Sequence, residues 1–340
     1  MSKRSVAGQA VMFCGIDVSA ATLAAAVQPE SQEGFQQREF ANSATGHKAL
    51  IAWLYKLGAT ARVSLEATGI YSLDLALALD GAEGIEVAVL NPRRVHQFAQ
   101  TLGRSKTDRA DALALAEYSR RMPLVGWRRP NRGALELRAL SRYIATLTEE
   151  HARLHNRLHA AEGSRTTPRC VREDLKRSMS GLRKRLLRLR RQAVSLIGQD
   201  PELERKFRSL TGITGIAETS AVQLLGELAS LDPEMSVRQW VAHSGLDPAH
   251  RISGASVHLP SRISRHGNRY LRRALYMPAL VGVRFDRHMK AFYQQLQTRH
   301  KTKLQALMAV ARKLLHAIFG IFKTNTPYDG SKLFPTLLPI

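Results

Sequence analysis

The stretch VMFCGIDVSAATLAAAVQP, residues 11–29, decides the architecture of the first part of the chain. Its two apolar runs, 11–19 and 22–29, are separated by a short break, which is typical of two strands joined in a hairpin. Strand and helix patterns alternate downstream, with strands expected at 36–42, 61–68 and 86–92 and helices at 46–58, 70–82 and 93–102. Hairpin strands followed by helix–strand units predict an α/β domain with a mixed sheet. The glycine-rich fingerprint of dinucleotide-binding domains does not follow the first strand, so that class is not favoured.

The pattern becomes purely helical from about residue 134. Apolar residues recur at alternating three- and four-residue spacing in two segments, separated by a break at 162–170, and this spacing favours a coiled-coil seam. The seam positions are Leu137, Leu140, Ile144, Leu147, His151, Leu154 and Leu158, then Leu175, Met179, Leu182, Leu186, Leu189, Ala193 and Leu196. The two segments are expected to pair either with each other, through a turn at Pro168, or with a second subunit. We interpret His151 as a seam residue that sets the register.

A third region begins near residue 206. Its sequence LTGITGIAETSAVQLLGEL, 210–228, fits either a helix–hairpin–helix that holds a phosphate or a plain glycine turn between helices. Further helices are expected at 236–246 and 302–322, and the last 18 residues resemble a tail. We therefore divide the chain into an α/β domain 1–130, a coiled-coil region 131–205, a mainly helical domain 206–322 and a tail 323–340.

Charge is the strongest compositional feature of the chain. Its 340 residues include 51 basic and 28 acidic side chains, a net charge of +23. Two segments hold nearly all of the excess, with 13 basic and 4 acidic residues in 151–200 and 14 basic and 1 acidic in 251–320. Such a concentration of one sign favours a polyanionic partner, and we expect nucleic acid.

Several protein classes are not favoured by the composition. Apolar runs are shorter than the roughly 18 residues of a transmembrane helix, and the first 15 residues show no hydrophobic region typical of a signal peptide. Cys14 and Cys170 are too few for a disulfide framework or a zinc cluster. We expect a cytoplasmic protein that associates with the nucleoid when active.

Four acidic residues stand in positions that favour metal binding. Asp17 and Glu66 lie where two predicted strands end, and Asp108 and Asp111 are three residues apart, on one face of a predicted helix. Each residue alone is best read as a surface charge or a helix cap. Together they predict a site for Mg²⁺, which prefers oxygen ligands and in pairs stabilises both reacting oxygens of a phosphoryl transfer.

Several motifs in this order resemble the DEDD insertion-sequence transposases of the IS110 type, a family that includes the Piv/MooV invertases and the IS-eleven-eleven subgroup. The resemblance covers residues 11–320 and rests on GIDVS (15–19), LEATGIY (65–71), NPRRVHQFAQTLGRSKTDRADALALAEY (91–118), LTGITGIAETSA (210–221), HSGLDPAHRISG (243–254) and ISRHGNRYLRRALYMPAL (263–280). It implies an RNase H-like (RuvC-like) N-terminal domain, a coiled-coil linker and a C-terminal transposase domain with a catalytic serine.

The resemblance assigns the acidic residues one by one. Asp17 matches the family's GxD pattern, Glu66 matches its ExTG pattern, and Asp108 with Asp111 matches KTDxxDA. These four are therefore the expected catalytic, metal-binding residues.

The family's serine signature, GLxP followed by SG, matches residues 245–248 and 253–254. It makes Ser253 the expected nucleophile, with Ser244 ranked second and Ser256, Ser261 and Ser264 third.

The same resemblance implies a reaction and its partners. The expected function is a transposase or recombinase that cuts and rejoins double-stranded DNA through a phosphoserine intermediate, with Mg²⁺ as cofactor. A structured bridge RNA would pair with target and donor DNA. The expected assembly is a homodimer, and a tetramer in the synaptic complex.

Basic residues near these motifs are expected to contact nucleic acid, because arginine and lysine bind phosphate oxygens. They are Arg93, Arg94, Lys106, Arg109, Arg183, Lys184, Arg185, Arg188, Arg251, Arg262, Arg265, Arg269, Arg272 and Arg273. Two alternatives remain open: a RuvC-like junction nuclease that uses water with the same carboxylates, and a non-catalytic basic nucleic-acid-binding protein.

Overall fold

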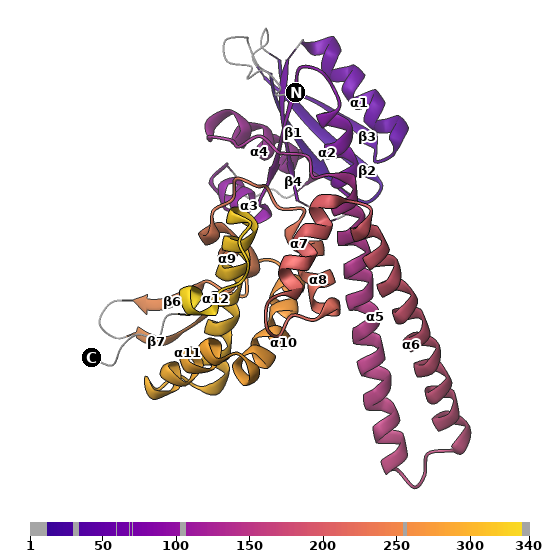
Figure 1. The fold of residues 1–340 in the computed structure, drawn as a ribbon. Coiled ribbons are helices and arrows are strands. Elements are labelled where there is room, and N and C mark those ends of the chain that lie inside the picture. The colour runs from indigo at the N-terminus through magenta and orange to yellow at the C-terminus, as the bar shows by residue number, and fades with distance from the viewer. Residues whose placement is uncertain are drawn as a thin grey trace. The chain divides into compact units, whose positions relative to one another are not determined.

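The computed structural model describes residues 12–29, 34–58, 60–67, 69, 71–102, 107–253 and 257–334, with backbone only between 250 and 261. The chain forms two compact units, Met1–Arg129 and Pro130–Ile340 (Figure 1). Each unit has its own hydrophobic core.

The first unit contains a five-stranded mixed sheet in the order β3-β2-β1-β4-β5. β1 pairs antiparallel with β2, which pairs antiparallel with β3, whereas β1–β4 and β4–β5 are parallel. The strands are β1 (Met12–Val18), β2 (Thr22–Gln28), β3 (Gln36–Ala41), β4 (Ala61–Glu66) and β5 (Ile85–Leu90). The mixed α/β sheet expected from the sequence is confirmed, and with its helices it matches an RNase H-like DEDD domain.

Helices cover both faces of this sheet. They are α1 (Ala44–Leu57), α2 (Leu73–Asp80), α3 (Pro92–Leu102) and α4 (Asp108–Arg121). Because side chains alternate along a strand, Cys14 and Ile16 of β1 face the core formed with α1 and α2. The intervening Gly15 faces α4 instead.

Gly15 lets α4 lie directly on β1. A Cβ atom at this position would be 2.2 Å from the carbonyl oxygen of Ala112 and from the backbone nitrogen of Ala116. α4 meets the sheet through small residues, and Ala112 and Ala116 pack with Ala24 and Ala26 of β2. This close packing brings the first turn of α4 to the edge where β1 and β4 end.

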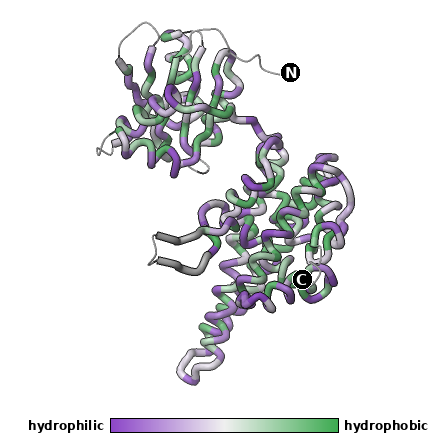
Figure 2. Tube along the Cα trace, turned by 90° about the vertical axis from the view of Figure 1, so that its left-hand side faces the viewer, coloured by the Kyte–Doolittle hydropathy of each residue, from purple (hydrophilic) through white to green (hydrophobic). Residues whose placement is uncertain are grey.

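The second unit begins with a long helical hairpin, α5 (Arg132–Gly163) and α6 (Arg169–Gly198) (Figure 1). Seam residues including Ile144, Leu147, Leu182 and Leu186 are buried. The two predicted segments therefore pair with each other, and hydrophilic residues recur along the projecting end (Figure 2).

In the remaining chain α8 contacts α5, α6, α7 and α10, and α12 contacts α7, α9, α10, α11 and α13. The helices of this part are α7 (Pro201–Thr211), α8 (Glu218–Leu228), α9 (Val237–Ser244), α10 (Arg269–Phe285), α11 (Arg287–Thr298), α12 (Lys303–Thr324) and α13 (Gly330–Leu333). Gly215, with φ +97°, packs tightly, since a Cβ would be 2.6 Å from the Pro278 carbonyl oxygen. Ile213 and Ile216 beside it are buried. The 210–228 motif is thus a packed glycine turn between α7 and α8.

Three features of this unit differ from the sequence expectations. Residues 248–263 form a two-stranded hairpin, β6 (Pro248–Ser253) and β7 (Val257–Ile263), and α10 and α11 are additional helices. Part of the expected tail is folded, because α13 follows α12 and Phe334 is only 1% exposed in the core. The prolines of this segment, Pro327 and Pro335, lie on either side of α13 in the sequence and do not interrupt it.

α12 is long and apolar enough, by length and composition, to span a membrane, and half of its most apolar window is buried. Its residues Val310, Leu314 and Ile318 are fully buried in the core of this unit. We therefore interpret α12 as a core helix.

Candidate active site

Four carboxylates, called the carboxylate cluster below, gather at one edge of the first unit: Asp17, Glu66, Asp108 and Asp111. β1 and β4 are adjacent and parallel, with Ile16 opposite Leu65, so their carboxyl-terminal ends carry Asp17 and Glu66 side by side. Asp108 and Asp111 lie in the first turn of α4, where the hydroxyl of Thr107 accepts a hydrogen bond from the backbone N–H of Ala110. The structure therefore brings all four predicted residues to one region.

The electrostatics of the cluster confirm this proximity. Burial raises the pKa of Asp17, and the charges of Asp108 and Asp111 raise it further, while a hydrogen bond from the Val18 backbone opposes them. Burial, and then the charges of Asp17 and Asp111, raise the pKa of Glu66 to about 7. Both pKa values are raised in the direction expected for carboxylates that lose solvent and lie near one another.

The donor set of the cluster fits a hard divalent cation. Within the described part of the chain, none of its four carboxylates forms a salt bridge. A bound divalent cation would therefore relieve the repulsion among them. Among the same residues, no three acidic, histidine or cysteine side chains lie close enough together to hold an ion as they stand. Binding would therefore require the carboxylates to turn toward a shared centre.

Ser253 is the last residue of β6, and its backbone pairs with Val257 of β7. Its side chain lies outside the described residues, as do those of Ser256 and Ser261. We call the β6–β7 segment, residues 248–263, the serine hairpin.

Two other candidate serines have structural hydrogen bonds. Ser244 is fully buried, and its hydroxyl donates to the Val241 carbonyl oxygen at 2.7 Å. The Ser264 hydroxyl donates to Asp247 Oδ1 at 2.5 Å, next to the base of the serine hairpin. The Ser244 hydroxyl therefore stabilises the end of α9, and the Ser264 hydroxyl links the two segments at the base of the serine hairpin.

The predicted nucleic-acid contacts separate into free and engaged side chains. Arg272 is half-buried and donates to the carbonyl oxygen of Ser244 at 2.9 Å, and Arg273 pairs with Glu149, so both have structural roles. Arg185 donates to the Tyr143 hydroxyl. Arg269 is exposed, but its guanidinium donates to the Tyr270 hydroxyl and lies over the Tyr270 ring. The remaining residues are exposed: Arg93, Arg94, Arg109, Arg183, Lys184, Arg188, Arg262 and Arg265. Lys106 and the Arg251 side chain lie outside the described residues.

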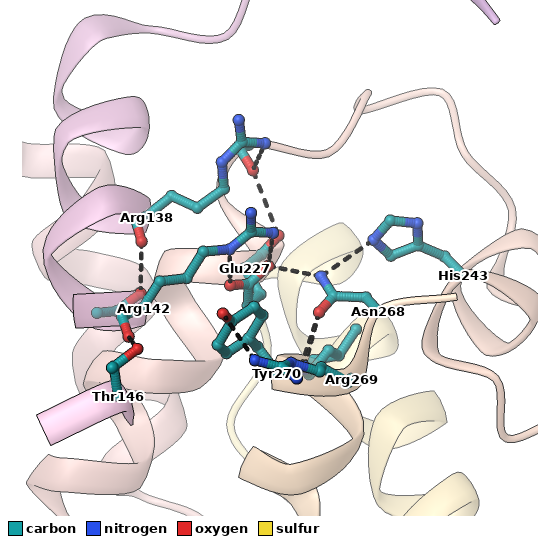
Figure 3. A network of polar contacts seen from close by, with 11 residues as sticks. Arg138, Arg142, Thr146, Glu227, His243, Asn268, Arg269 and Tyr270 are labelled. Carbon is teal, nitrogen blue, oxygen red and sulfur yellow. Dashed lines mark hydrogen bonds and ion pairs between the residues drawn. The ribbon is translucent and has the colours of Figure 1, made fainter. Parts of the chain in front are cut away.

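A buried polar network was missed by sequence reasoning (Figure 3). We call it the Glu227 network: Glu227 on α8, Arg142 on α5, His243 at the end of α9, and Asn268 just before α10. One signal could have revealed it, because Glu227 falls between the apolar residues Leu225 and Leu228 of a predicted buried helix face. Burial lowers the pKa of His243, and the nearby Arg142 and Arg138 act in the same direction.

Comparisons with known proteins agree with this architecture. A family model described as Transposase matches residues 14–161, and one described as Transposase IS116/IS110/IS902 family matches residues 208–294. The chain is 30% identical over 325 residues to the pilin gene-inverting protein of Moraxella bovis. The aligned residues cover 93% of this chain and 97% of that protein. The pilin gene-inverting protein of Moraxella lacunata matches to the same extent. An insertion element IS110 protein of Streptomyces coelicolor is 28% identical over 121 residues, or 36% of this chain and 30% of that protein.

Proposed function

Because the chain belongs to the IS116/IS110/IS902 family of transposases and is a DNA transposase or recombinase, we propose that it cuts and rejoins DNA through a phosphoserine intermediate on Ser253. Mg²⁺ bound by the carboxylate cluster is the cofactor in this proposal. The observation that carries it is the carboxylate cluster, whose members form no salt bridge with a described residue and in which the pKa of Glu66 rises to about 7.

In this proposal the Ser253 hydroxyl oxygen attacks a DNA phosphorus. A serine–phosphorus bond forms, one phosphorus–deoxyribose oxygen bond breaks, and the proton of the serine passes to the released deoxyribose hydroxyl. The phosphodiester energy is kept in the phosphoserine, so the DNA can be rejoined without an external energy source. A serine hydroxyl needs activation for this step, and Mg²⁺, when bound, would supply positive charge against the phosphate.

Exposed arginines close to Ser253 in sequence support phosphate binding. Arg262, Arg265 and Arg269 are exposed, and guanidinium groups match phosphate oxygens in two-point geometry. These contacts fix the DNA backbone and do not read its sequence.

Sequence reading is assigned in this proposal to a bridge RNA that pairs with target and donor DNA. Aromatic residues make up only 6% of the chain, which argues against extensive base stacking by the protein. Exposed Arg183, Lys184 and Arg188 on α6 provide a further phosphate-binding face.

Recombination cuts several strands, so we also propose a homodimer that forms a tetramer on synapsis, with the α5–α6 hairpin contributing a coiled-coil contact. The site of action is the bacterial cytoplasm, on the nucleoid.

The test is a denaturing gel that detects protein covalently attached to element-end DNA. Wild-type chain, Mg²⁺ and co-purifying RNA are compared with Ser253→Ala, with Asp17→Asn and with the matched control Ser244→Ala. We expect the adduct in wild type and in Ser244→Ala. Ser253→Ala and Asp17→Asn should lower it by about 10³-fold or more while DNA binding is retained.

Two results would contradict the proposal. An adduct that persists in Ser253→Ala excludes this serine as the nucleophile. Mg²⁺-dependent nicking without an adduct, equal in wild type and Ser253→Ala, identifies instead a RuvC-like nuclease that uses water.

A further inference from the structure

The two ends of the serine hairpin are tied to each other at its base. Before the hairpin, the backbone oxygens of Gly245 and Asp247 accept hydrogen bonds from the backbone nitrogens of Arg265 and Ser264, at 3.1 and 2.8 Å. The Ser264 hydroxyl adds a third bond to Asp247. The hairpin is therefore joined to the helical body by two hydrogen-bonded segments, residues 245–247 and 264–267, which we call the neck.

This neck meets the helical body at Asn268. The backbone nitrogen of Asn268 donates to the His243 carbonyl oxygen at 2.6 Å. Gly267 makes the close approach possible, because it has φ +113° and a Cβ there would be 2.3 Å from the same oxygen. A side chain at this position would push the two ends of the neck apart.

The Asn268 side chain has two functions at once. Its Oδ1 caps α10 by accepting from the backbone nitrogens of Tyr270 and Leu271, at 2.9 and 3.1 Å. Its Nδ2 donates to Glu227 Oε2 at 2.5 Å and lies 3.3 Å from the His243 ring (Figure 3). The cap and the link to Glu227 thus use different atoms of one side chain.

Glu227 connects this point to the long hairpin of the second unit. It is 2% exposed and accepts two bonds from Arg142 of α5, at 2.7 and 2.8 Å. Gly226 brings α8 close enough to α5, since a Cβ there would be 2.3 Å from the Ser141 hydroxyl oxygen. A buried carboxylate held by two-point contacts fixes geometry strongly, because moving it would leave a charge unpaired.

We propose that Glu227 and Asn268 are positioning residues for DNA strand cleavage. They attach the neck of the serine hairpin to α5 and α8, and so determine where Ser253 meets the scissile phosphate. The inference rests on the proposed function of Ser253. A displacement of about 1 Å at a reacting group costs up to about 10²-fold in rate.

The experiment exchanges donor and acceptor between the two positions in the full chain. Asn268→Asp keeps the α10 cap, because a carboxylate oxygen accepts equally well, but it removes the amide donor and places a second carboxylate against Glu227. The double variant Glu227→Gln/Asn268→Asp restores one hydrogen bond with the direction reversed, but it loses the bond that Glu227 Oε2 accepts from Arg142. Asn131→Asp is the matched control, since Asn131 likewise caps a helix, α5, and donates to a carboxylate, Asp200.

Two readouts are measured. The first is the rate of adduct formation with inorganic Mg²⁺, co-purifying RNA and element-end DNA, and the second is amide hydrogen exchange of the 248–263 peptide without DNA. We expect Asn268→Asp to lower the rate about tenfold and to accelerate exchange in the hairpin, with DNA binding unchanged. The double variant should recover part of both effects, and Asn131→Asp should change neither.

Unchanged rate and exchange in Asn268→Asp would overturn the inference, as would a double variant no better than the single one. If wild type gives no adduct, the proposed function fails. Hydrogen exchange would then decide separately whether the Glu227 network holds the hairpin.

Discussion

Two glutamates that are shielded from water to different degrees, one in each unit, differ in the partners that the protein gives to their carboxylates. Glu66 is half-buried beside other acids and has no cationic partner among the described residues, and its pKa rises to about 7. Glu227 is far more buried, but Arg142 and Asn268 occupy both of its oxygens. The Glu66 carboxylate is therefore available to bind a cation, whereas both oxygens of Glu227 already accept hydrogen bonds.

The difference teaches that burial alone does not identify a functional acid. An internal carboxylate whose lone pairs are satisfied by the protein has a structural role, and one whose charge is opposed by neighbouring acids is ready for a cation. The predictions that follow test this distinction by removing a partner, by disturbing the packing under the cluster, and by neutralising one acid.

The largest effect is expected from removing the cation that satisfies Glu227. Arg142→Ala leaves a nearly inaccessible carboxylate without its two-point partner, and we expect the second unit to lose about 3 kcal/mol of unfolding free energy. Urea unfolding followed by pulsed hydrogen exchange of α8 measures this.

Arg132→Ala is the matched control on the same helix as Arg142, because Arg132 pairs with Glu136 at 2.7 Å but is 90% exposed. Its urea midpoint should not change. Equal effects of the two variants would show that burial of the pair is irrelevant.

A smaller effect is expected from disturbing the contact that brings α4 to the carboxylate cluster. Gly15→Ala places a methyl group 2.2 Å from backbone atoms of α4, which cannot rotate away. We expect a loss of about 2 kcal/mol in the first unit and a higher Mg²⁺ concentration at half-maximal cleavage, because Asp108 and Asp111 move with the helix.

Gly181→Ala is the control for that substitution. Gly181 lies within α6, and nothing is within 4 Å of a Cβ built there. The same change should therefore stabilise the second unit by about 1 kcal/mol through helix propensity. Hydrogen exchange of β1 and of α6 reports the two results. An unaltered Mg²⁺ requirement in Gly15→Ala would separate the packing of α4 from the metal site.

The sequence predicted the first unit well because its signals are local. Apolar runs marked the strands, and Asp17 and Glu66 could be placed at the ends of their strands from those runs alone. The proximity of Asp17 and Glu66 follows from parallel strands having their carboxyl ends at one edge, whereas Asp108 and Asp111 reach this edge on α4. Nothing near Gly15 in the sequence indicates its role, because the helix that packs against it, α4, begins more than 90 residues later.

The second unit was less predictable because its decisive contacts join distant segments. The strands of the serine hairpin, PAHRIS and VHLPSRI, lack clean alternation, and the second contains Pro260, so their pairing was not expected. Glu227 and Arg142 are 85 residues apart. A buried glutamate in an apolar helix face indicates that a partner exists, but not which arginine supplies it.

The smallest effect is expected from neutralising Glu66. Its pKa rises from 4.5 to about 7 on folding, so the folded chain holds a proton that the unfolded chain releases. Stability is therefore full below about pH 4.5 and is lost as the pH rises through 7. Glu66→Gln should reduce this loss in the first unit by about 1 kcal/mol between pH 5 and 8, a value lowered for solvent screening at a half-exposed group. Urea unfolding with pulsed hydrogen exchange of β4 measures it.

Glu86→Gln on the adjacent strand is the control, because Glu86 already has a cation, Arg62, at 2.8 Å. We expect it to retain the wild-type pH dependence of the first unit. Mg²⁺ added at pH 8 should then stabilise wild type and Glu86→Gln more than Glu66→Gln, because only an unsatisfied carboxylate gains from the ion. If Glu66→Gln and Glu86→Gln behave alike, with and without Mg²⁺, the lack of a cationic partner among the described residues is not what distinguishes Glu66 from a half-buried, paired acid such as Glu86.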